Sequence, residues 1–99
     1  MQRMVDCFVG KYRLGADVQT RYIDLVSEVG ELGKEIIRAT DYGRKGYSQN
    51  AGAVEEVGDC LFSLIALCSE MGVSAEEALC RAIQKYEARF ELKGSVGSG

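Results

Sequence analysis

Two pairs of acidic residues are the side chains of this sequence best suited to chemistry. Glu28 and Glu31 are three positions apart, and so are Glu56 and Asp59. Residues three or four apart on a helix lie on one face, so each pair would present both carboxylates to the same side. Histidine is absent, which excludes histidine bases, His-containing zinc sites and the Glu-x-x-His motif of di-iron bundles. Any catalysis must therefore depend on carboxylates, lysine, arginine, hydroxyls or thiols.

The first pair belongs to a longer acidic strip, which we define as Asp24, Glu28, Glu31 and Glu35. On a helix these four residues fall within an arc of roughly 60°. Like charges at such spacings repel by a few tenths of a kcal/mol per pair, and no cation occupies the arc. Acidic helix faces are nevertheless common when they are fully solvated, so the strip alone does not separate a metal site from an ordinary polar surface.

The second pair directly precedes a strongly apolar segment. Asp59 adjoins residues 60–68, in which Ser63 is the polar position. A helix that is apolar around its full circumference must be buried on most sides. An ionised carboxylate beside a dry core costs several kcal/mol unless it is paired, so Asp59 is expected to need a cation. An exposed aspartate near the start of a helix is the alternative.

Long helices with short breaks are the elements expected to position these acids, because proline is absent and glycine occurs in a few clusters. Asp17 is a good N-cap, Gly72 suits a left-handed C-cap, and Ser74 with Glu77 forms a capping box. We expect helices over about residues 2–12, 17–40, 51–71 and 74–92, a loop over 41–50, and a disordered tail over 94–99. Residues 1–93 are expected to form a single helical domain.

The short connection between the second and third helices favours antiparallel packing, which allows the two acidic pairs to face each other. Oxygen ligands without histidine or thiolate favour Mg²⁺, with Mn²⁺ as the alternative. A magnesium site that retains waters suits a phosphate substrate. A calcium-storage protein is disfavoured because no D-x-D-x-D-G loop is present.

Composition limits the other classes of function. The net charge is -3, without the basic excess of a nucleic-acid-binding module, so no nucleic-acid partner is expected. The apolar segment is far shorter than the roughly 20 residues that span a membrane, so no membrane partner is expected either. No signal-peptide pattern opens the sequence, and a cytoplasmic location is the default. The four cysteines show no metal-finger spacing, and Cys60 and Cys68 are expected to behave as small apolar residues.

The residues around both acidic pairs resemble a known family. Ser-Glu-Val-Gly-Glu-Leu at 27–32 and Glu-Glu-Val-Gly-Asp-Cys-Leu-Phe at 55–62 resemble the E-x-x-E and E-x-x-D motifs of the MazG-like nucleotide pyrophosphohydrolases. The resemblance covers about residues 20–92 and continues to Lys85 and Arg89 of the last helix. Where the family often has asparagine, this chain has Ile83, so base preference is not carried over.

The resemblance implies an all-α fold, a four-helix MazG-like bundle, in which Glu28, Glu31, Glu56 and Asp59 hold Mg²⁺ at a nucleoside triphosphate. It further implies cleavage of the α–β phosphate bond to a nucleoside monophosphate and pyrophosphate, in a role of nucleotide-pool house-cleaning. Glu28 or Glu31 would be the general base. Lys85 and Arg89 would contact phosphate or form a solvated basic patch. Glu35 would bind a second ion or face water.

Three alternatives stay open. The first is a phosphoribosyl-ATP pyrophosphohydrolase, which shares the fold and the acidic motifs; the second is an all-α dUTPase-like enzyme. The third is a non-catalytic helical interaction module in which the acids serve only solubility. In every case we expect a homo-oligomer, a dimer or a tetramer that completes the bundle, because one short chain cannot cover a helix that is apolar on all sides.

Overall fold

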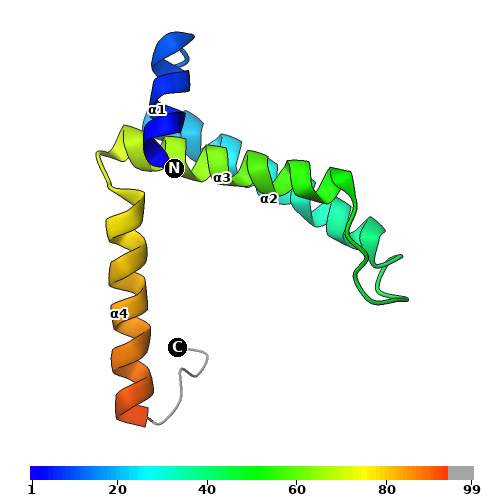
Figure 1. The fold of residues 1–99 in the computed structure, drawn as a ribbon. Coiled ribbons are helices and arrows are strands. Elements are labelled where there is room, and N and C mark those ends of the chain that lie inside the picture. Colours follow the sequence, from blue (N-terminus) through cyan, green and yellow to red (C-terminus); the bar gives the residue numbers. More distant parts are fainter. Residues whose placement is uncertain (94–99) are drawn as a thin grey trace.

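The computed structural model describes residues 1–93, and this part of the chain folds into four α-helices without a strand. The helices are α1 (Gln2–Lys11), α2 (Val18–Ala39), α3 (Ala51–Met71) and α4 (Ala75–Lys93). Figure 1 shows α2 and α3 lying side by side, α1 against the C-terminal half of α3, and α4 projecting away after a sharp bend. The expected all-α, four-helix fold is confirmed, whereas the expected tail at 94–99 lies outside the described residues.

The helix ends follow from local capping chemistry. The Asp17 carboxylate accepts a hydrogen bond from the Thr20 amide at 2.8 Å, and the Asn50 side chain accepts one from Ala53 at 2.7 Å. Gly72 closes α3 in the left-handed region, with φ of 72°. These caps place the long helices where the sequence predicts them, within about one residue.

Only the serine half of the expected capping box forms. The Ser74 hydroxyl accepts a hydrogen bond from the Glu77 amide at 3.2 Å. The Glu77 carboxylate, however, accepts from Arg81 at 2.9 Å, one turn further along α4. A charged partner at i+4 therefore competes with the return bond of the box.

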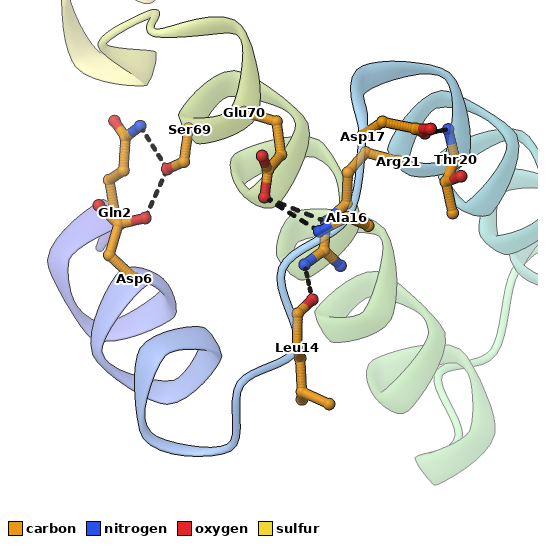
Figure 2. Close-up of polar contacts among 9 residues, drawn as sticks. All are labelled: Gln2, Asp6, Leu14, Ala16, Asp17, Thr20, Arg21, Ser69 and Glu70. Atoms are coloured by element: carbon orange, nitrogen blue, oxygen red, sulfur yellow. Dashed lines mark hydrogen bonds and ion pairs between the residues drawn. The ribbon is translucent and has the colours of Figure 1, made fainter.

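A buried arginine ties the α1–α2 connection to α3, as Figure 2 shows. The Arg21 guanidinium donates to the Leu14 carbonyl and lies 3.9 Å from the Glu70 carboxylate. Glu70 also accepts a weak hydrogen bond from the Ala16 amide at 3.4 Å. Because Arg21 is only 7% exposed, this contact is a fixed part of the packing rather than a surface ion pair.

The apolar core within one chain is small. Val5 of α1 packs on Ile65 and Ala66 of α3, and the Phe8 and Phe62 rings meet edge to face with centroids 5.8 Å apart. The chain exposes 7416 Å², whereas a compact monomer of its mass exposes about 5,500 Å². Its radius of gyration is 16.6 Å, against about 12.6 Å for a compact domain of this length.

Large apolar faces consequently remain uncovered. On α2, Leu25 and Leu32 are half-buried, whereas the other large apolar side chains of the helix are exposed. The exposed apolar side chains of the three long helices include Tyr22, Val29 and Ile36 on α2, Leu61 and Leu64 on α3, and Leu79, Ile83, Tyr86 and Phe90 on α4. Within residues 1–93 no single helix has the length and apolarity to cross a membrane, although α3 and α4 reach that composition together across their 100° bend.

Replacing Gly72 with Ala should destabilise the protein by about 1–2 kcal/mol, because a side chain at positive φ is strained. The same change at Gly10, near the end of α1 with open space around it, is the matched control. Gly10→Ala should be neutral or stabilising by up to about 1 kcal/mol, since alanine is the better helix former. Thermal unfolding at one fixed protein concentration measures both, and destabilisation of equal size in the two variants would contradict the assigned role of Gly72.

Candidate metal centre

Packing of α2 against α3 brings together three of the four predicted acids. Glu28, Glu56 and Asp59 each offer one carboxylate oxygen to a group whose members all lie within 4.8 Å of one another. We call these three residues the acidic cluster. Glu28 comes from the middle of α2, and Glu56 and Asp59 come from the first half of α3. The cluster therefore exists only when the two helices are packed.

Burial makes the charges of this cluster costly. Glu28 and Glu56 are half-buried, and Asp59 is exposed at the rim. The Oε2 atom of Glu56 is buried and has no hydrogen-bond partner among residues 1–93. Its burial raises the pKa of Glu56, and the neighbouring charges of Asp59, Glu28, Glu31 and Glu35 raise it further. The ionised form of Glu56 is therefore disfavoured unless a positive charge lies beside it.

Two other members of the acidic strip, Glu31 and Glu35, have cationic partners. Glu31 is exposed and lies 3.6 Å from the Lys34 ammonium group, while Glu35 is half-buried and lies 3.1 Å from the Arg38 guanidinium. The sequence wheel placed no cation within the strip, but these two side chains reach it from one turn further along. Glu31 is close enough to influence the pKa of Glu56 but lies outside the cluster.

Glycine at position 52 permits a close approach that the sequence did not predict. A Cβ atom at this position would lie 2.9 Å from the Glu35 Oε2 atom and 3.3 Å from Asn50 Oδ1. The Glu35 carboxylate therefore lies close to the start of α3, where the partial positive charge of a helix N-terminus favours a negative group. The signal available in the sequence was a glycine directly inside a helix start, which is an unfavourable place for it without a packing reason.

The basic residues predicted to bind phosphate lie elsewhere. Lys85 and Arg89 are in α4, which Figure 1 shows extending away from α2 and α3. Their cationic groups lie 5.1 Å and 5.9 Å from the centre of the Tyr86 ring. The described chain thus brings the acids of two helices together and leaves these two cations apart from them.

The donor atoms fit a divalent cation that prefers oxygen. Three carboxylates supply hard ligands, and the unpartnered oxygen of Glu56 is the atom such an ion would satisfy. The nearby Cys60 thiol is not a competing ligand. Its burial raises its pKa, as do the charges of Glu28, Glu56 and Asp59, and a thiol is a soft ligand that suits Mg²⁺ or Mn²⁺ poorly.

An open apolar groove of about 670 Å³ borders the cluster, a feature that sequence reasoning missed. It runs between α1 and α3, and its walls include Met4, Phe8, Leu61 and Phe62. Asp59 lies at its edge and so belongs both to the groove and to the acidic cluster. The groove depends on how α1 docks, which periodicity along one helix does not reveal.

Replacing Glu56 with Gln should raise the melting temperature of the metal-free protein, because it removes one of several repelling charges from a half-buried position. The same change should remove stabilisation by Mg²⁺ or Mn²⁺, which for wild type reaches about 1.4 kcal/mol at ten times the Kd. Glu55→Gln, one residue away and exposed, is the matched control and should keep that stabilisation. Equal metal-induced shifts in the two variants, measured by thermal unfolding, would argue against the cluster as the metal site.

Comparison with known proteins identifies the family of the chain. A family model described as the MazG nucleotide pyrophosphohydrolase domain matches residues 17–91, which include α2, α3 and all three residues of the cluster, while α1 precedes the match. Uncharacterized protein YpjD of Bacillus subtilis (strain 168) is 31% identical over 91 residues, covering 90% of this chain and 82% of the relative. No solved structure matches the chain significantly. The chain therefore belongs to the MazG nucleotide pyrophosphohydrolase family, whose all-α domain acts on nucleotide phosphoanhydrides.

Proposed function

We propose that this protein is a Mg²⁺-dependent nucleoside triphosphate pyrophosphohydrolase that cleaves the α–β phosphate bond and so helps to clear unwanted nucleotides. The products would be a nucleoside monophosphate and pyrophosphate. The observation that carries this proposal is the acidic cluster, in which both family motifs contribute carboxylates and the inner oxygen of Glu56 lacks a partner. Mn²⁺ is the alternative ion, because it accepts the same oxygen ligands.

The acids divide naturally into two roles. Glu28, Glu56 and Asp59 would hold the ion, which when bound neutralises phosphate charge and makes water more acidic. Glu31 lies nearby but outside this group, and its exposed carboxylate, which also contacts the Lys34 ammonium group, would accept the proton of the attacking water. Glu28 is the second candidate base. Glu35, held by Arg38 at the start of α3, would sit behind the site and receive no direct substrate contact.

The positive charge that a triphosphate requires would come from a second copy of the chain. Lys85 and Arg89 lie on α4, which projects away from the acids of its own chain. The area exposed beyond that of a compact monomer exceeds the roughly 800 Å² per partner of a standard interface. In a homodimer, α4 of one copy would cover apolar surface of the other and bring its cations toward the partner's acidic cluster. A dimer of dimers would give the tetramer.

The reaction is tested by incubating the protein with a panel of nucleoside triphosphates and Mg²⁺, and analysing the phosphate products. Wild type should release pyrophosphate, and Glu56→Gln or Asp59→Asn should lower kcat by about 100-fold or more, as expected for loss of a group that stabilises transition-state charge. Glu55→Gln should retain activity. Release of orthophosphate alone would reject α–β cleavage, and full activity in either cluster variant would remove that residue from the site.

Complementation between inactive variants tests whether the site is shared between copies. Glu56→Gln lacks a working cluster, and the double variant Lys85→Ala with Arg89→Ala lacks the cations. Mixed by co-refolding, they should recover about a quarter of the wild-type sites if each site takes acids from one copy and cations from the other. Recovery should be absent if each site is built within one copy.

Sedimentation of the wild type provides the companion measurement. It should give a dimer or tetramer at micromolar concentration. A stable monomer would reject the shared site.

Arg81→Ala is the matched α4 control for the double variant, because Arg81 pairs with Glu77 on the same helix and should be dispensable.

A further inference from the structure

The first side chain of α1 meets the bend between α3 and α4. The Gln2 amide nitrogen donates to the Ser69 hydroxyl at 2.9 Å and to the Val73 carbonyl at 3.0 Å. The Gln2 amide oxygen accepts from the Ala75 backbone amide at 2.8 Å. Figure 2 shows the contact with Ser69, whose hydroxyl in turn donates to Asp6 of α1. One carboxamide thus joins three helices across more than 60 positions of sequence.

These hydrogen bonds act where the chain changes direction. The amides in the first turn of a helix have no partner within the helix, and Ala75 is the first residue of α4. Ser74 caps this turn in the usual way by accepting from the Glu77 amide, and this leaves the Ala75 amide to Gln2. Gln2 therefore caps α4 from outside, and it binds the carbonyl of Val73 within the connection itself. The axes of α3 and α4 differ by 100° at this point.

Apolar packing at the bend is slight by comparison. Ala75 packs half-buried against the cluster formed by Val5, Ile65 and Ala66. Further along α4, large side chains such as Leu79 and Ile83 are exposed within the chain. Polar contacts near residue 75 therefore have a large share in fixing the direction of the helix, and a small change of angle there moves its far half by several ångströms.

We propose that Gln2 is a positioning residue that sets the direction in which α4 leaves α3, and thereby the place at which Lys85 and Arg89 are presented to substrate. The effect of Gln2 on substrate binding rests on the proposed function, whereas its effect on the angle between α3 and α4 does not. Gln2 lies outside residues 17–91, so this device is an addition to the matched family domain. Neither its residue type nor its place at the start of the chain points to a role in the reaction.

The direct test measures the angle with the chain's own thiols. Cys7 of α1 and Cys80 of α4 are both exposed, so nitroxide labels can be attached to them after Cys60 and Cys68 are changed to Ala. Co-refolding with excess unlabelled protein leaves one labelled copy per assembly. Electron–electron double resonance then gives the distance distribution across the bend, which should broaden or shift in Gln2→Met.

Enzyme kinetics on unlabelled protein supply the second readout. Gln2→Met should raise KM for the triphosphate several-fold with a smaller effect on kcat, because binding groups are misplaced while the acidic cluster is intact. Gln2→Glu keeps the acceptor for Ala75 but loses the donor to Val73, so its effects should be intermediate. This second variant also keeps the test available if Gln2→Met folds poorly.

Ser74→Ala is the matched control, because it removes a cap of the same helix without touching α1. It should lower the melting temperature by about 4–8 °C for each kcal/mol lost, yet leave both the distance distribution and KM unchanged. An unaltered distribution in Gln2→Met would overturn the proposal, and so would a broadened distribution with wild-type KM. If the wild type cleaves no triphosphate, the proposed function fails, while the distance measurement still decides whether Gln2 fixes the bend.

Discussion

Mutual repulsion among carboxylates that helix packing forces together is the constraint on which the rest of this structure depends. Apolar contacts between α2 and α3 hold Glu28 against Glu56 and Asp59 within 4.8 Å, although each charge disfavours the others. The favourable free energy of packing offsets this repulsion. The repulsion that remains between the carboxylates would be relieved by a positive charge placed among them. A divalent cation bound there would relieve the repulsion, and metal binding would then be thermodynamically linked to the stability of the α2–α3 pair.

The cations near the acidic strip explain why the uncompensated negative charge is concentrated at one place. Lys34 and Arg38 neutralise Glu31 and Glu35, the two strip residues nearer the end of α2. Within the described part of the chain Glu56 has no such partner, and its Oε2 atom is buried away from water. If every acid of the strip were unpaired, repulsion would be spread along the whole interface between the helices. Because Glu31 and Glu35 are paired, the uncompensated negative charge is concentrated at the acidic cluster, where an ion can be bound by several ligands at once.

Local chemistry accounts for what the sequence predicted well, and tertiary packing accounts for what it did not. Asp17, Asn50 and Gly72 determine helix ends through contacts within three or four residues, so those ends were predictable. The three-residue spacing likewise put forward Glu28, Glu31, Glu56 and Asp59 as a set, of which the structure brings Glu28, Glu56 and Asp59 together. Exclusion of Glu31 depends on the rotation of α2 relative to α3, which no single helix encodes. The contacts of Arg21 with Glu70 and of Gln2 with Ala75 join distant segments, and periodicity carries no information about them.

The separation of the acids from the cations of α4 keeps a competing positive charge away from the acidic cluster. A lysine or arginine within about 4 Å of Glu56 in the free chain would pair with it, and would then compete directly with a metal ion. Placing Lys85 and Arg89 on a helix that points away keeps the cluster available to the ion. In the proposed assembly these cations approach from a second copy, where they meet phosphate rather than their own acids. The angle at which α4 leaves α3 would then determine where these cations lie in the active site, although Gln2, the residue proposed to fix that angle, belongs to α1.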